Sequence, residues 1–160
     1  MSDNPTEKLI RDFQDRITRG AYEGIYALDE AARDGVMQCQ AHACVRAFTE
    51  LYQISDDLDL DGFLEKMTMG GSSRIRIQRE DPNTILWEEL HEGECMCPFV
   101  TREVIPLEPG LCSCAVHWLR MLVERHVVGP VKVELLDSAA QGSENCVFRI
   151  EIEDPSPPRR

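Results

Sequence analysis

Residues 112–127 read CSCAVHWLRMLVERHV, and this stretch decides the fold. Its apolar side chains recur at three- and four-residue steps, which is the spacing of one face of an α-helix. Gly129-Pro130 follows one residue later and is a typical end signal for a helix. On both sides of this helix the apolar period changes from 3.6 to two, as expected for strands that have one buried face.

Two strands are predicted before the helix and two after it. Asp81-Pro82-Asn83 is a turn signal between the first two, and a polar turn with Gly142 separates the last two. The predicted strands cover residues 74–78, 84–90, 131–136 and 146–153. The order β-β-α-β-β predicts one antiparallel sheet of four strands with the helix packed on one face.

Residues 1–69 are predicted to be helical. Asn4-Pro5 starts a first helix that Gly20 would end, and a weaker helical piece follows as far as Gly35. A third helix is predicted over Val36–Leu51 and a short one over Gly62–Met67. The chain is therefore expected to be an α+β protein with one domain over 1–153, made of a helical part (1–69) and an α+β core (70–153). Residues 154–160 are predicted to be a disordered tail.

Composition restricts the partners and the compartment. The 160 residues carry a net charge of −12, with a pI near 4.7, which disfavours binding to nucleic acid phosphates. No apolar run is long enough to predict a membrane span, and the first residues do not resemble a signal peptide. These features predict a cytoplasmic protein with reduced thiols and with neither nucleic acid nor membrane as partner.

Four of the seven cysteines form two close pairs, Cys95-Met-Cys97-Pro98 and Cys112-Ser-Cys114. Thiolates are soft ligands that bind zinc or iron–sulfur clusters. The pairs predict a zinc site of four sulfurs, with an iron–sulfur cluster as the alternative. Buried packing thiols and a redox dithiol, in which Cys112 attacks and Cys114 resolves, are further interpretations. The start of a helix would lower the pKa of Cys112.

Three other side chains are alternate ligands on the basis of position. His117 lies three residues after Cys114, so both share a helical face. Cys39 and Cys44 lie on the third predicted helix, from which one thiol could reach the two pairs.

The C-terminal third resembles a known family. Val131-Lys-Val-Glu134-Leu-Leu-Asp137, a polar turn and Cys146-Val-Phe-Arg-Ile150 resemble the signature of 4-vinyl-reductase-like domains. These are small α+β ligand-binding modules, related in fold to haem–nitric-oxide binding domains and to TRAPP vesicle-tethering subunits. The resemblance covers about residues 70–153, and a cysteine-rich group of uncharacterised prokaryotic proteins ends similarly. It implies zinc ligands at Cys112 or Cys114, Glu134 and Cys146, while the family's further cysteine is Asp137 here.

The resemblance also implies a pocket for a small apolar or aromatic molecule. Its candidate lining residues are Trp87, His91, Phe99 and Trp118. The expected function is a zinc-containing ligand-binding or sensory module that acts as a monomer or homodimer. A zinc-dependent hydrolase with His117 or Glu94 as general base is an alternative, as is thiol-redox or iron–sulfur chemistry.

Overall fold

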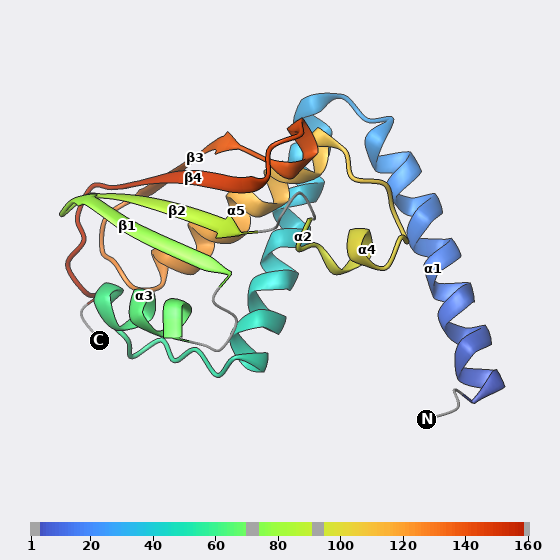
Figure 1. Ribbon diagram of the computed structural model, residues 1–160, viewed down its shortest axis with the longest axis horizontal. Helices are drawn as coiled ribbons and strands as arrows, with labels where there is room; N and C mark the ends of the chain where they lie inside the picture. The colour runs from blue at the N-terminus through green and yellow to red at the C-terminus, as the bar shows by residue number, and fades with distance from the viewer. Residues whose placement is uncertain (1–3, 70–73, 91–94, 159–160) are drawn as a thin grey trace.

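The computed structural model (Figure 1) describes residues 4–69, 74–90 and 95–158 and has the predicted α+β architecture. Three helices are followed by two strands, a helical segment, the central helix and two more strands. The elements are α1 (Pro5–Tyr26), α2 (Glu30–Leu51), α3 (Leu60–Met69), β1 (Ile75–Asp81), β2 (Thr84–Leu90), α4 (Pro98–Thr101), η1 (Pro109–Leu111), α5 (Cys112–Glu124), β3 (Val131–Asp137), η2 (Ala139–Gln141) and β4 (Asn145–Ile152).

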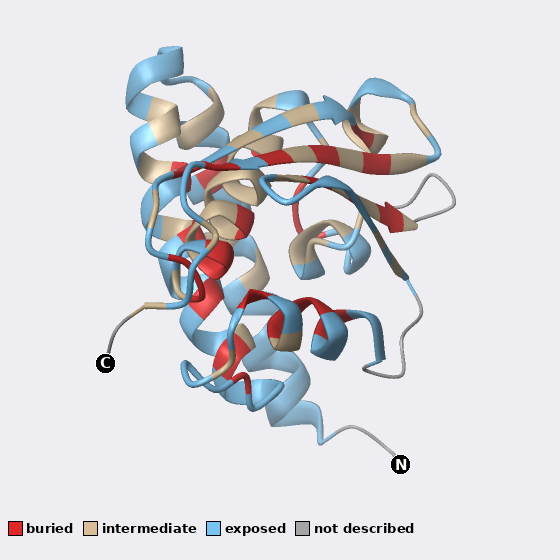
Figure 2. Cartoon of the chain, turned by 90° about the vertical axis from the view of Figure 1, so that its left-hand side faces the viewer, coloured by how far each residue is buried: buried red, intermediate tan, exposed pale blue. Residues whose placement is uncertain are grey.

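The four strands form one antiparallel sheet in the order β1-β2-β4-β3, which confirms the predicted sheet. Strands β2 and β4 lie at its centre, where Trp87 is paired with Phe148 and Ile85 with Ile150. All four of these side chains are buried. Figure 2 shows the resulting alternation of buried and less buried residues along the central strands. The alternation of apolar and polar residues in the sequence therefore corresponds to a sheet with one buried and one solvent-exposed face.

The main core lies between this sheet and helices α3 and α5. Leu119, Leu122 and Val123 of α5 are fully buried, as the amphipathic pattern predicts. Phe63 of α3 stacks on Trp87 with ring centroids 6.4 Å apart, and on His126 at 4.5 Å. The buried His126 ring is fixed by a 2.9 Å hydrogen bond between its Nδ1 and the Leu58 carbonyl oxygen.

The predicted boundaries of the first helices are wrong. Helix α1 continues through Gly20 to Tyr26, and α2 begins at Glu30 rather than at Val36. The start of α2 is set by Asp29, whose side chain accepts a hydrogen bond from the Ala32 N–H at 2.9 Å. An isolated glycine inside a helix reduces helix stability by only about 1 kcal/mol relative to alanine. The hydrogen bonds and packing of the neighbouring helical turns offset this loss.

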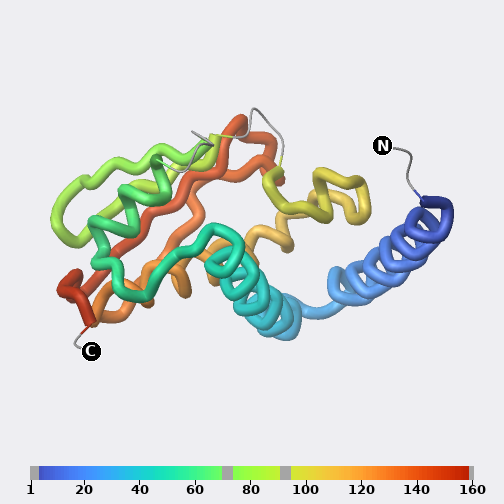
Figure 3. Tube along the Cα trace, turned by 90° about the horizontal axis from the view of Figure 1, so that it is seen from below, coloured from blue at the N-terminus to red at the C-terminus, as the bar shows by residue number. Residues whose placement is uncertain are grey.

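A second, smaller core connects α1, α2 and the segment before α5. We call it the tyrosine cluster, and its buried residues are Tyr22, Met37, Val104, Ile105 and Leu111. Polar contacts of α1 reinforce it. Asp15 forms a 2.8 Å ion pair with Arg102, and Arg19 Nε donates to the Val104 carbonyl oxygen at 3.1 Å. Figure 3 shows that α1 extends well beyond this attachment.

The chain after β4 runs back beside the end of α5. The N–H groups of Val128 and Gly129 donate to the carbonyl oxygens of Ser156 and Asp154 at 2.9 and 3.0 Å. A Cβ atom at position 129 would lie 2.2 Å from the Asp154 nitrogen, so this close approach requires glycine. None of the helices in the described ranges combines the length and apolar character needed to cross a membrane.

Candidate metal centre

The first cysteine pair lies at a turn of the backbone. Cys97 is the N-cap residue of α4, and its N–H donates to Cys95 Sγ at 3.4 Å. The Cys95 thiol therefore lies against the backbone that leads into α4. In a continuous strand the two thiols would point to opposite faces, and the start of α4 at Pro98 ends such a strand directly after Cys97.

The second pair begins helix α5 and lies near the first. Cys97 and Cys114 both pack against the tyrosine cluster. The thiolate of Cys97 contributes to raising the pKa of Cys114, and that of Cys112 contributes to raising the pKa of Cys95. Such repulsion weakens quickly with distance, which agrees with the shared packing of Cys97 and Cys114 on the tyrosine cluster. All four residues are partly exposed rather than sealed in the core.

Two alternate ligands, Cys44 and Cys146, also lie close to the pairs. The pKa of Cys44 on α2 is raised mainly by burial and to a smaller extent by repulsion from the Cys97 thiolate. Cys146, at the start of β4, adds to the raised pKa values of Cys95 and Cys112. Its buried Sγ accepts a hydrogen bond from the Ala139 N–H at 3.5 Å. Cys39 and Cys44 are both exposed on α2, but Cys39 does not contribute to the raised pKa values of the other described thiols.

Burial is the main influence on these thiols. It raises the pKa of Cys95 to about 11 and that of Cys114 to about 12, with smaller contributions from the neighbouring thiolates. Burial also raises the pKa of Cys112, although a hydrogen bond with the Ser138 side chain opposes it. The prediction that a helix start lowers the pKa of Cys112 is therefore wrong. The residues before Cys112 already have helical backbone angles, with Leu111 of η1 at φ −74° and ψ −27°. Cys112 therefore does not lie at a free helix N-terminus, where a helix dipole would lower its pKa.

The raised pKa of Cys114 predicts a loss of stability in alkali for the metal-free protein. Folding favours the protonated thiol, so this stabilisation is complete below the ordinary pKa of 9.0 and disappears as the pH rises toward 12. We expect Cys114→Ser to reduce the decrease in the free energy of unfolding across this interval. Urea titrations at several pH values measure the free energy of unfolding, and Cys39→Ser is the control. An unchanged pH dependence in Cys114→Ser would contradict the assignment.

His117 is held by an acidic side chain of another helix. Its Nε2 lies 2.9 Å from Asp34 Oδ1 on α2, and its side chain is 12% exposed. Nδ1 is buried and has no hydrogen-bond partner among the described residues. The second candidate base, Glu94, lies outside the described residues.

Glu134 and Cys146, which the family resemblance placed in one zinc site, are on opposite faces of the sheet. Glu134 is exposed and is paired with Arg149, whereas Cys146 shares the buried face of β4 with Phe148. The structure therefore does not bring Glu134 to Cys146. Asp137 follows at the end of β3, where its Oδ1 accepts a hydrogen bond from the Ser143 hydroxyl at 3.2 Å.

The aromatic residues predicted to line a pocket have separate surroundings. Trp87 is buried in the main core, and Phe99 lies 6.0 Å from Tyr22 in the tyrosine cluster. Trp118 packs edge-on against Phe48 of α2, with ring centroids 5.0 Å apart. His91 lies outside the described residues. Two surface hollows of about 360 and 270 Å³ are lined by none of Trp87, Phe99 and Trp118.

Two tyrosines next to the thiols were not singled out by sequence. The Tyr22 hydroxyl donates to Gln40 Oε1, and the Tyr26 hydroxyl donates to the Pro106 carbonyl oxygen at 3.4 Å. Burial raises the pKa of Tyr26 to about 12, with contributions from Glu108 and from three of the thiolates. No sequence signal identified them, because they reach the thiols only through the packing of α1.

No protein-family model and no curated protein matches this sequence. Within the described ranges, no three His, Cys, Asp or Glu side chains are already arranged as a metal-binding group. The structure places two partly exposed cysteines, Cys97 and Cys114, against the tyrosine cluster beside the start of α5.

Proposed function

We propose that this protein is a small metal-binding module that holds one zinc ion through Cys95, Cys97, Cys112 and Cys114. The observation that supports the proposal best is the approach of the two cysteine pairs, one at a turn before α4 and one at the start of α5. Four thiolates satisfy the tetrahedral coordination that structural zinc prefers. Zinc would connect the segment before α4 to the central helix and so link the two cores.

The accessibility of the thiols favours metal binding over simple packing. Cysteines that only fill space are usually buried, as Cys146 is, whereas the four proposed ligands are partly exposed. The raised pKa values of Cys95 and Cys114 mean that these two thiols are protonated at neutral pH in the metal-free protein. Zinc would displace these protons, which makes the affinity depend on pH.

The same pKa values disfavour the redox interpretation. An attacking cysteine needs a lowered pKa so that it is a thiolate at neutral pH. The pKa of Cys112 is raised by burial. Thiol exchange at this position would therefore be slow, whereas a metal ion can stabilise the thiolate directly.

Cobalt(II) substitution tests the proposal. Metal-free protein titrated with cobalt is expected to develop strong sulfur-to-cobalt charge-transfer absorption that saturates at one ion per chain and disappears when zinc is added. Cys97→Ser should weaken this absorption, and Cys39→Ser, the control on the exposed surface of α2, should leave it unchanged. Absence of the absorption, or the same spectrum in both variants, would make the cysteines packing residues.

A further inference from the structure

Helix α1 carries an apolar stripe that faces solvent. The exposed fractions of Leu9, Ile10, Phe13 and Ile17 are 69, 51, 64 and 58%. These side chains fall on one side of the helix at about 100° per residue. We call these four residues the α1 stripe. An exposed apolar surface of this extent on a single helix face usually marks an interaction site.

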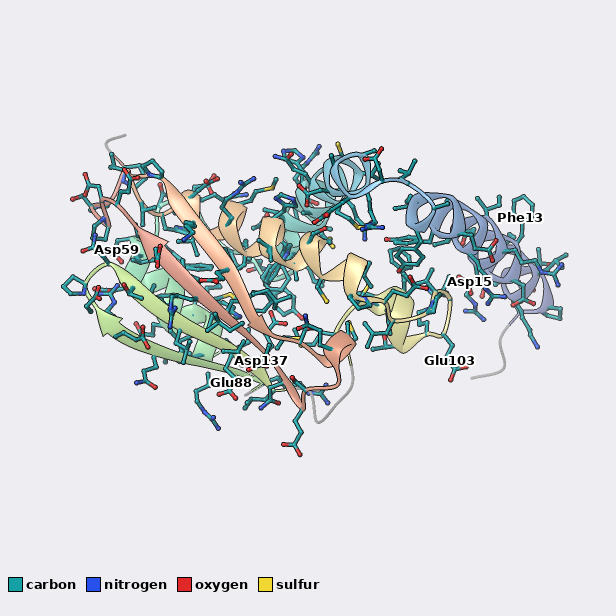
Figure 4. All side chains as sticks on the ribbon, turned by 90° about the horizontal axis from the view of Figure 1, so that it is seen from above. Phe13, Asp15, Asp59, Glu88, Glu103 and Asp137 are labelled. Carbon is teal, nitrogen blue, oxygen red and sulfur yellow. The ribbon has the colours of Figure 1, made fainter. Side chains whose placement is uncertain are left out.

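The opposite side of α1 attaches the helix to the protein. Tyr22 is buried there, Asp15 is ion-paired with Arg102, and Arg19 binds the Val104 carbonyl oxygen. Figure 4 shows Phe13 pointing away from the rest of the chain, while Asp15 lies on the side toward Glu103. Surface helices normally turn their apolar side to the core. Helix α1 does the reverse, so its apolar side is available to another molecule.

The charges of the chain disfavour a membrane as that partner. Helices that lie on membranes carry Lys and Arg on their polar side, which attract anionic lipids. The net charge here is −12, and α1 itself mixes acidic and basic residues. A protein surface with a complementary pattern fits the stripe better.

We propose that the α1 stripe pairs with the α1 stripe of a second copy of this chain, in antiparallel orientation around Phe13. Leu9 and Ile17 each lie four residues from Phe13, on either side. Antiparallel pairing therefore places Leu9 of one copy against Ile17 of the other, twice. The two Phe13 rings meet at the twofold axis, which gives the self-complementary contact of a symmetric dimer.

The charges beside the stripe agree with this orientation. Asp12 and Arg16 border the stripe on the same flank, at about 100° and 60° from Phe13. In an antiparallel pair like flanks meet, so Arg16 of one copy faces Asp12 of the other, and the reverse. In a parallel pair Arg16 would face the opposite edge of the stripe, which Ile10 forms and Gln14 borders.

The available area fits a weak dimer. Each exposed side chain of the stripe offers on the order of 100 Å², so the stripes of two copies together bury somewhat less than the roughly 1,000 Å² of a stable specific interface. Gly20 lies on the same side of α1 as the stripe, and an added Cβ atom there would meet nothing within 4 Å. In the antiparallel pair Gly20 faces Thr6 of the second copy, so the two helices can approach closely at this end of the contact.

Sedimentation equilibrium over a range of protein concentrations tests the pairing. We expect a dimer whose dissociation constant rises at least about tenfold in Phe13→Asp. Leu51→Asp, at an apolar position that is 75% exposed on α2, is the matched control and should not change it. Circular dichroism shows whether each variant remains folded, which is expected because both positions are exposed.

A charge exchange separates pairing from a general loss of structure. Asp12→Arg alone should weaken the dimer through repulsion by Arg16, and the double variant Asp12→Arg/Arg16→Asp should restore it to within about threefold. A monomer at every concentration, a dimer unaffected by Phe13→Asp, or no rescue by the double variant would overturn the proposal. Binding of a monomer to phosphatidylcholine vesicles through the stripe would also overturn it.

Discussion

Replacing Cys112 by serine is expected to lower the melting temperature of the zinc-loaded protein by on the order of 10 °C or more, and replacing Cys39 to leave it nearly unchanged. Cys112 begins α5, and its thiolate would join the central helix to the segment before α4. Loss of one ligand removes zinc affinity that contributes directly to folding stability. Cys39 is exposed on α2, so its replacement removes little buried surface.

Calorimetry with and without a chelator measures this difference. The chelator should lower the melting temperature of the unmodified protein and of Cys39→Ser, and should have little effect on Cys112→Ser. Equal small losses in both variants, insensitive to the chelator, would show that Cys112 is a packing residue.

The second large effect is expected in the main core and does not depend on metal. Trp87→Ala should reduce the free energy of unfolding by about 3–5 kcal/mol. Trp87 is fully buried at the centre of the sheet, beside Phe148 on β4, and Phe63 stacks on it. Removal of the indole leaves a cavity between sheet and helices that the rigid strands cannot close.

Urea denaturation measures the loss, and Trp118→Ala is the matched control. Trp118 packs edge-on against Phe48 and is only partly buried, so its truncation should cost clearly less. A loss below about 1 kcal/mol for Trp87→Ala would mean that the strands are not packed as described.

The sheet and its helix could be predicted from the sequence because their apolar periods are clear. The alternation along β2 and β4 reports one buried face, and the spacing in α5 reports one helix face. The helix boundaries near Gly20 and Gly35 could not be predicted. Both glycines lie inside helices whose neighbouring turns and N-cap at Asp29 outweigh the local cost of glycine.

The candidate site was predictable only in part. The close spacing within each cysteine pair was visible in the sequence, but the turn at Cys95 and the approach of Cys44 depend on tertiary packing. Glu134 was predicted to be a zinc ligand only because of the family resemblance. Its alternation with Val133 and Leu135, which face inward, already indicated the wet side of β3.

The sequence also could not predict which side of α1 faces the protein. Apolar spacing identifies one side of a helix but does not say whether the core or a partner covers it. The ion pair of Asp15 with Arg102, formed between residues far apart in the chain, decides which side of α1 faces the protein.

X-ray absorption at the zinc edge, on protein purified without added metal, tests the central claim most directly. The proposal predicts about one zinc per chain with four sulfur neighbours at about 2.3 Å. The signal should lose one sulfur, or disappear, in Cys97→Ser and remain intact in Cys39→Ser. A chain without stoichiometric metal, a zinc ion bound mainly by nitrogen or oxygen, or iron–sulfur scattering from a brown protein would contradict a four-thiolate zinc centre.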